Sequence, residues 1–190
     1  MPDIKPNTLP LVSYLRERLT YDPKTGALRW RERPQSHFAC EQAWSAWNIK
    51  YALMDAGTKS KGYLIVKMDG SAYSAHRIAW KLFSGEEPPP TIDHRDCNPA
   101  NNIWENLRPA TRSQQMWNAR ANRNNTLGKR GVYLHRSGRC VARINYKRVA
   151  YCLGLFDTIE EASAAYERAA RELHGEFYRE PKKWDQKLVV

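Results

Sequence analysis

The chain has 190 residues, with 31 lysines and arginines against 20 aspartates and glutamates, so its formal net charge is +11. A hydrophobic content of 42% allows a packed core, argues against wholesale disorder, and suits one ordinary domain or two small ones. No run of about 18 apolar residues is present, so we expect no membrane span and no membrane partner. The first residues lack the apolar core of a secretion signal, and the four cysteines show no CxxC spacing. We therefore expect a reduced, cytoplasmic protein without structural zinc or a disulfide framework.

The basic excess is confined to one segment. Eleven of the 31 lysines and arginines lie within residues 106–156, which contain no aspartate or glutamate; the other 20 are balanced by the 20 acidic residues. A merely solvated basic face is the alternative interpretation. The complete absence of acids over 51 residues favours binding to a polyanion, with nucleic acid as the leading candidate.

The first half of the chain predicts helices and hairpins. Apolar spacing and turn residues predict, in order, a helix, two hairpins and a second helix at 9–19, 19–30, 61–74 and 76–83. The second hairpin is the clearer one, because Asp69 and Gly70 form a two-residue turn signal that favours type I′. Residues 31–58 contain aromatic side chains but no firm period, so no element is predicted there.

Residues 91–120 predict a strand, a polar loop, a second strand and a helix. The strands are 91–94 and 106–110, and the loop between them is rich in turn residues. Thr111, followed three residues later by Gln114, is a capping box that opens the helix.

The last third predicts a three-stranded antiparallel sheet with one helix. The alternating runs are 131–136, 139–146 and 149–156, and the helix begins at a capping box on Thr158 and ends at His174. An alanine stripe on this helix allows close packing against the sheet. The opposite face of the sheet then stays open and carries arginines.

The pair Asp93 and His94, together with Asn106-Leu-Arg108, resembles the HNH nucleases. The wider pattern is that of phage-type HNH homing endonucleases, and it includes His76-Arg-Ile-Ala-Trp80, Gly85 to Pro88, Ile92 to His94, Asn98, Asn101, Asn102, residues 106–113 and Asn118. The last third is similar to an AP2 DNA-binding domain. The matching residues are Arg130-Gly-Val132, residues 153–158, Glu161, Ala162, Ala165, Tyr166, Ala169, Ala170 and Leu173-His-Gly175.

The HNH resemblance implies roles for three residues. His94 is the general base, Asp93 is a metal ligand, and Asn106 is a scaffold residue that ties down the loop and orients His94. This chemistry is reasonable, because a neutral imidazole suits a base and carboxylate and amide oxygens suit Mg²⁺, with Mn²⁺ as an alternative. Strand alternation alone would turn Asp93 and His94 to opposite faces, unless the strand ends or bulges there.

The chain departs from the family pattern at the second metal ligand. The resemblance implies an asparagine on the helix after the second strand, but this position is Gln115. Asn118 lies three residues further, on nearly the same helix face. Either Gln115 or Asn118 holds the metal, or the site is weakened or inactive.

The AP2 resemblance implies that the sheet lies in the major groove of double-stranded DNA. Arginine can read guanine there and asparagine can read adenine. The candidate contacts of the last third are Arg130, Tyr133, His135, Arg139, Arg143, Asn145, Lys147 and Arg148. Three further candidates on or after the predicted helix would hold the DNA backbone: Arg112, Arg120 and Arg123.

Together these inferences predict an α+β DNA endonuclease of two modules. The expected domains are an HNH (ββα-metal) nuclease domain with N-terminal hairpins, a linker, an AP2-like domain and a tail at 1–120, 121–129, 130–180 and 181–190. We expect a homing-type, nicking enzyme of phage origin in a bacterial host, monomeric, with a dimer as the alternative. The rival hypothesis is a catalytically inactive, sequence-specific DNA-binding regulator with the same fold. An RNA-binding module has less support, because no RNP-type aromatic pattern is present.

Overall fold

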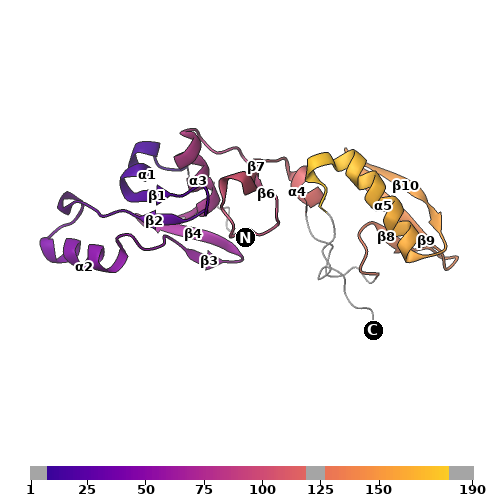
Figure 1. The fold of residues 1–190 in the computed structure, drawn as a ribbon, viewed down its shortest axis with the longest axis horizontal. Helices are drawn as coiled ribbons and strands as arrows, with labels where there is room; N and C mark the ends of the chain where they lie inside the picture. The colour runs from indigo at the N-terminus through magenta and orange to yellow at the C-terminus, as the bar shows by residue number, and fades with distance from the viewer. Residues whose placement is uncertain (1–7, 119–126, 180–190) are drawn as a thin grey trace. The chain divides into compact units, whose positions relative to one another are not determined.

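The computed structural model describes residues 8–118 and 127–179. The chain forms two compact units that divide between Pro109 and Ala110, and each mixes helices with small antiparallel sheets (Figure 1). An α+β fold is therefore confirmed. The division places the helix at Arg112–Asn118 in the second unit, whereas the sequence assigns it to the nuclease domain. Within the described ranges, no helix has the length and apolar character needed to cross a membrane.

The first unit is built from hairpins and three helices. Its elements in chain order are α1 (Val12–Arg18), β1 (Leu19–Tyr21), β2 (Leu28–Trp30), a 3₁₀ turn (Gln35–His37), α2 (Glu41–Tyr51), β3 (Thr58–Ser60), β4 (Tyr63–Met68), β5 (Ser71–Ser74), α3 (Ala75–Ser84), β6 (Ile92–His94), a second 3₁₀ turn (Trp104–Asn106) and β7 (Leu107–Pro109). The strands pair antiparallel as β1–β2, β3–β4–β5 and β6–β7.

Two turns of the first unit have the backbone conformation that the sequence predicts. Asp69 and Gly70 both have positive φ, +48° and +76°, as the type I′ turn between β4 and β5 requires. Gly85 ends α3 with a left-handed φ of +79°. Both hairpins and α3 were predicted, but α2 and β3 were not.

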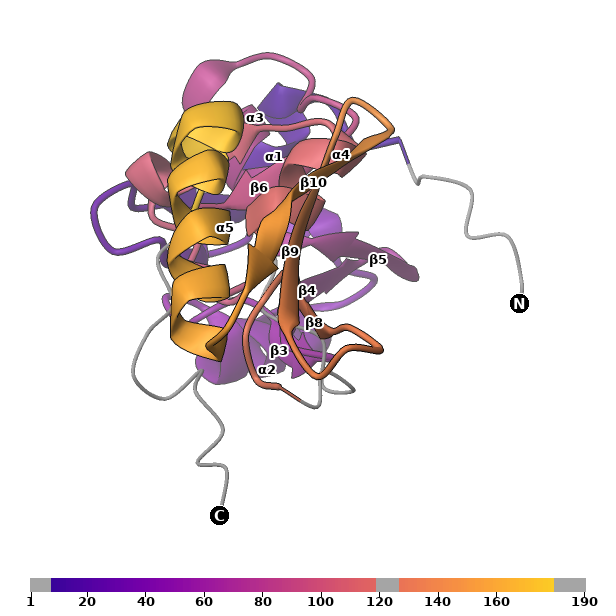
Figure 2. The same cartoon turned by 90° about the vertical axis from the view of Figure 1, so that its right-hand side faces the viewer.

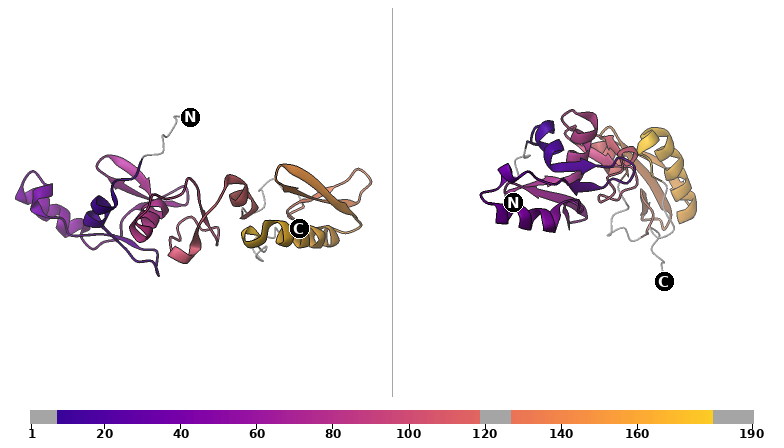
Figure 3. Two further views of the ribbon diagram at one scale, coloured as in Figure 1. Left: turned by 90° about the horizontal axis from the view of Figure 1, so that it is seen from above. Right: turned by 60° about the vertical axis from the view of Figure 1, so that its left-hand side comes forward.

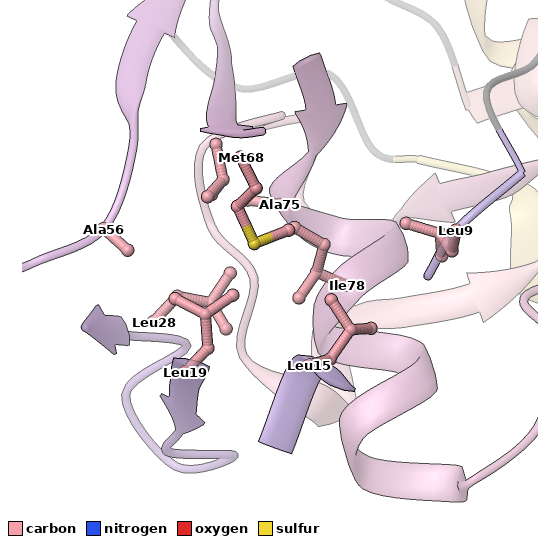
Figure 4. Packing of buried hydrophobic residues seen from close by; sticks show 9 residues of the cluster. Leu9, Leu15, Leu19, Leu28, Ala56, Met68, Ala75 and Ile78 are labelled. Carbon is pink, nitrogen blue, oxygen red and sulfur yellow. The ribbon is translucent and has the colours of Figure 1, made fainter. Parts of the chain in front are cut away.

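One hydrophobic core joins the hairpins to the helices of the first unit. Leu15 from α1, Leu19 and Leu28 from the first hairpin, and Ile78 from α3 are almost completely buried and pack together (Figure 4). A smaller cluster of Ala79, Ile92 and Leu107, with Trp80 against it, attaches α3 to the β6–β7 ribbon. The ribbon that carries Asp93 and His94 is thus anchored on α3.

The second unit consists of a short helix, a sheet and a long helix. Its elements are α4 (Arg112–Asn118), β8 (Val132–Leu134), β9 (Cys140–Tyr146), β10 (Val149–Phe156), α5 (Ile159–His174) and a 3₁₀ turn (Gly175–Phe177). The sheet order is β10–β9–β8, and α5 covers one of its faces (Figure 2, Figure 3). The predicted three strands and one helix are therefore present.

The contact between α5 and the sheet is close. The capping box at Thr158 starts α5, with Glu161 N–H donating to the Thr158 hydroxyl at 3.2 Å. Gly131, at φ +72°, lies so near the ring of Tyr166 on α5 that an added Cβ would be 2.1 Å from it. Only glycine fits at this position.

Helix α4 packs within the second unit. The ring of Trp117 stacks on His174 at 4.7 Å, with 5° between the planes, and on Tyr146 at 5.4 Å. The Arg130 guanidinium donates to the carbonyl oxygen of Trp117 at 2.6 Å and also to that of Met116. These contacts cap the C-terminal end of α4 with a cation.

Candidate active site

Asp93 and Arg108 form a buried ion pair across the β6–β7 ribbon. The strand register places the two residues opposite each other. The Nε and Nη2 atoms of Arg108 lie 2.9 and 2.8 Å from the same carboxylate oxygen of Asp93. Their side chains are 4% and 9% exposed, so each charge depends on the other for compensation. The ion pair fixes the orientation of the Asp93 carboxylate.

His94 is the last residue of β6, and a cage of side chains surrounds its ring. Its Nε2 lies 3.3 Å from the amide oxygen of Asn102. The ring of His76 packs edge-on at 5.3 Å, and that of Tyr63 lies at 6.3 Å. Because an amide oxygen only accepts, this contact places the proton of the neutral imidazole on Nε2 and the lone pair on Nδ1.

Burial keeps the two histidines neutral. Burial lowers the pKa of His94, although the hydrogen bond to Asn102 and the carboxylates of Asp96 and Asp93 oppose this shift. Burial, with smaller contributions from His94 and Arg77, lowers the pKa of His76 to about 3. His94 is therefore in the form that a general base needs at neutral pH.

Asn106 ties down the loop that follows His94. Its side-chain oxygen accepts from the backbone N–H of Asp96 at 3.0 Å, and its Nδ2 donates to Asp96 Oδ1 at 2.9 Å and to the carbonyl of Asn101 at 2.8 Å. Burial raises the pKa of Asp96, but hydrogen bonds from Asn101, Asn98 and Asn106 outweigh it and keep this pKa below its usual value. Asn106 therefore holds the loop at Asp96 and Asn101, whereas the contact to the His94 ring comes from Asn102.

Asn102 itself is held by the first hairpin. It is 1% exposed, and its carbonyl accepts from the hydroxyl of Tyr21 at 2.7 Å. Gly26, at φ +74°, lies against the same backbone, where an added Cβ would be 2.5 Å from the N atom of Ile103. The sequence pattern includes Asn102 but assigns it no role, because its partners are 8 and 81 residues away along the chain.

The protein donors for a metal ion are few. Among residues 8–118 and 127–179, no three histidine, cysteine, aspartate or glutamate side chains cluster closely enough to hold a metal ion. Gln115 and Asn118 lie on α4 in the second unit, where Asn118 is buried and Gln115 is half-buried. The carboxylate of Asp93 is an oxygen donor of the kind that Mg²⁺ prefers. With so few protein ligands, a bound Mg²⁺ would keep several water molecules and contact the substrate phosphate, instead of being enclosed by protein ligands alone.

The face of the β8–β10 sheet that points away from α5 carries polar side chains. On β9, Ala142 and Ile144 are buried on the α5 side, whereas Arg143 and Asn145 are exposed on the open face, as alternation predicts. Val141 belongs to the open face but is only 5% exposed, because it pairs with Tyr133 and Leu155 on the neighbouring strands.

The other predicted DNA contacts are located as follows. Arg139 pairs with Asp157 at 2.8 Å, and His135 contacts the Ser137 hydroxyl at 2.8 Å. Exposed positions at the start of α4 and in the β9–β10 turn are held by Arg112, Lys147 and Arg148. Arg130 is half-buried and donates to the carbonyl oxygen of Trp117 at the end of α4. Arg120 and Arg123 lie outside the described residues.

The sequence comparisons agree with this location of the site. The family model that matches the chain is described as HNH endonuclease and covers residues 73–117, from β5 into α4. This range, called the HNH segment below, includes His76, Asp93, His94, Asn102 and Asn106, whereas Tyr63 lies before it.

A relative from a phage is also similar. The chain is 30% identical over 106 residues to Protein 3.8 of Escherichia phage T7, over 55% of this chain and 87% of that protein. The chain therefore belongs to the same family as this phage protein. No solved structure matches the chain.

Proposed function

We propose that the protein is a metal-dependent DNA endonuclease of the homing type that nicks its target, with His94 as general base. The observation that supports this most is the buried His94 imidazole, which lies within the HNH segment and is held at Nε2 by Asn102. A group in this state can take a proton from water at neutral pH.

The residues of the site divide the work of hydrolysis. His94 takes a proton from a water molecule, and the water attacks the phosphorus in line. Arg108 pairs with the Asp93 carboxylate and orients it. A Mg²⁺ or Mn²⁺ ion held by Asp93 would neutralise charge on the phosphodiester. The bond between phosphorus and the 3′ oxygen breaks, the leaving oxygen takes a proton from solvent, and the products are a 5′-phosphate and a 3′-hydroxyl.

Target binding is assigned to the AP2-like second unit. Arg143 and Asn145 stand exposed on the open sheet face, and Tyr133 beside them is 56% exposed. A guanidinium and an amide in this arrangement can contact guanine and adenine edges in a major groove, and the ring can pack on a thymine methyl group. We propose double-stranded DNA as the partner of this face and a monomer as the working form.

A DNA-binding regulator without nuclease activity is the second candidate. Two observations favour it: Gln115 replaces the asparagine of the family pattern, and Arg108 already neutralises Asp93. In this case the second unit would bind DNA while the ribbon serves only as scaffold.

Plasmid nicking separates the two candidates. Wild-type protein incubated with supercoiled plasmid and Mg²⁺ or Mn²⁺ should convert it to the open circle, and His94→Ala should not. His37→Ala is the matched control, because it removes a histidine outside the HNH segment that pairs with Glu17. If wild type binds DNA but leaves the plasmid intact with both metals, or if His94→Ala nicks at the wild-type rate, the nuclease proposal is wrong.

A further inference from the structure

The first unit contains a pocket that the proposed nuclease chemistry does not use. Its volume is about 560 Å³, within the usual range for small-molecule sites. Helix α2 forms one wall, and Figure 1 shows α2 at the end of the first unit remote from β6 and β7. The pocket lies in residues 30–69, before the HNH segment begins.

Three aromatic rings line this pocket. Trp30 and Trp47 meet edge to face at 5.8 Å, and Trp47 meets Tyr51 at 5.4 Å. Trp47 is half-buried and Tyr51 is 38% exposed, so their rings are accessible from the pocket. A group of accessible aromatic rings of this kind is typical of a binding site.

Helix α2 is attached in a way that leaves these rings available. The carbonyl of Arg33 accepts from Trp44 Nε1 at 2.7 Å and from Asn48 Nδ2 at 2.9 Å, and the Arg33 N–H donates to Asn48 Oδ1 at 3.0 Å. No residue of α2 is fully buried. Trp44 and Asn48 therefore attach the helix to the backbone of Arg33. Trp47 and Tyr51 on the same helix line the pocket.

The same pocket carries cationic groups. The guanidinium of Arg33 lies 4.7 Å from the centre of the Trp47 ring, and its buried Nε has no hydrogen-bond partner among the described residues. Burial, and then the charge of Arg18, lower the pKa of Arg33, although Glu17 opposes them. Lys67 is exposed on β4 at the pocket wall.

The acids of the pocket do not cancel these cations. The carboxylate of Asp55 pairs with Arg29 at 3.2 Å. Among the other lining residues, the single negative charge of Asp69 is outnumbered by the two positive charges of Arg33 and Lys67. The pocket thus combines stacking surfaces with a small positive excess. This combination suits a ligand with an aromatic ring at one end and an anion at the other.

We propose that this pocket binds one unpaired nucleotide of a DNA strand, with its base on Trp47 and Tyr51 and its phosphate beside Arg33 and Lys67. Stacking on aromatic side chains accepts any base, and neighbouring cations follow the backbone, which is how sequence-tolerant sites for single strands are built. The inference takes its ligand class from the proposed function, but it adds a second DNA site of a different kind. The open sheet face would bind paired DNA, whereas this pocket holds a base outside the duplex.

Fluorescence anisotropy without divalent metal tests the pocket. The probes are a labelled 20-base-pair duplex, the same duplex with one bulged nucleotide at its centre, and the labelled single strand. Because stacking of one base is worth about 5-fold or more in affinity, wild type should bind the bulged duplex about 5-fold more tightly than the perfect one. Trp47→Leu and Tyr51→Leu should abolish this preference and keep the affinity for the perfect duplex.

The control is Ile49→Ala, on the same helix but 84% exposed and not part of the pocket lining. It should keep the full preference for the bulge. Tyr51→Leu changes a partly exposed side chain, so it keeps the test valid if Trp47→Leu does not fold. The proposal is wrong if wild type shows no preference, or if both leucine variants retain it.

The two proposals fail separately. Plasmid nicking by a wild type without bulge preference would reject the pocket and leave the nuclease. Bulge preference in a wild type that nicks no plasmid would reject the nuclease and leave the pocket.

Discussion

Removal of the Asn106 side chain should loosen the loop around His94. Asn106→Ala deletes three hydrogen bonds, two to the backbone N–H of Asp96 and the carbonyl of Asn101 and one to the Asp96 carboxylate. Asn106 is 9% exposed, so water cannot easily replace it. The loop leads from His94 to Asn102, which holds the imidazole, so its disorder should reach the catalytic base.

The magnitude follows from the kinds of hydrogen bond lost. Each neutral bond contributes about 0.5–1.5 kcal/mol net, and one to a charged group about 1.5–3 kcal/mol. The lower bounds for these three bonds add up to about 2.5 kcal/mol. We expect the free energy of unfolding to fall by about 3 kcal/mol, near this lower bound, because Asp96 is only partly buried and water can replace some of its contacts. Against the usual 5–15 kcal/mol for a domain, this is a large fraction.

Urea unfolding followed by tryptophan fluorescence, together with plasmid nicking, measures both effects. Asn98→Ala is the matched control, since Asn98 is exposed in the same loop and its side chain accepts one bond of 3.2 Å, from Ala100. It should cost about 1 kcal/mol or less. If Asn106→Ala keeps wild-type stability but loses nicking, Asn106 acts on the substrate and its scaffold role is wrong.

Three further predictions concern support of the site. Gly26→Ala forces a Cβ onto the loop backbone at positive φ, so it should lower the melting temperature and slow nicking more than it weakens DNA binding; equal rates would mean that the first hairpin does not position the loop. Burial lowers the pKa of His76 to about 3 in the folded chain, whereas in the unfolded chain it lies near 6.5. Between these pH values only the unfolded chain binds the proton, so the free energy of unfolding should fall as the pH drops from about 6.5 toward 3. His76→Phe should flatten this slope in urea titrations, and an unchanged slope would contradict the burial of His76. A chain truncated after residue 126 loses the partners of Trp117, so nicking itself should fall along with target choice; full activity of this fragment would show that α4 does not depend on Arg130, β9 and α5.

Elements fixed by local chemistry could be predicted from the sequence. The turn at Asp69 and Gly70 is set by two residues, and the capping boxes at Thr111 and Thr158 are each set within four residues. Alternation on β9 also predicts the two faces of the strand, but it does not predict that Val141 on the open face is buried. It missed Val141 because cover from Tyr133 and Leu155 depends on strand register, which period alone does not give.

Helix α2 could not be predicted for a different reason. A surface helix is usually recognised by an apolar stripe, and α2 has no fully buried residue to form one. It is attached instead by Trp44 and Asn48 on the backbone of Arg33, a contact between residues 11 and 15 positions apart. The aromatic residues were visible in the sequence, but the pocket that they form with Arg33 was not.

In the candidate site, too, the local pattern was visible in the sequence but the contacts between distant residues were not. Asp93, His94 and Asn106 were identified by their pattern, yet their supports Arg108 and Asn102 received no role. The Asp93–Arg108 pair follows from the register of two three-residue strands, which the 12 residues between them leave undetermined. Asp93 meets its cross-strand partner Arg108, whereas His94, at the end of the strand, meets Asn102.

Contacts within the protein reduce the number of cations in residues 106–156 that are available to bind DNA. Of the eleven cations of this segment, Arg108, Arg130 and Arg139 are engaged within the protein. Five others are exposed in the described part of the segment: Arg112, Arg136, Arg143, Lys147 and Arg148. If each neutralises one phosphate, log K for duplex DNA should fall with log salt at a slope of about −4.5. Arg143→Ala should reduce this slope by about 1, whereas Arg130→Ala should destabilise α4 without changing it. An equal reduction by both variants would show that Arg130 contacts phosphate after all.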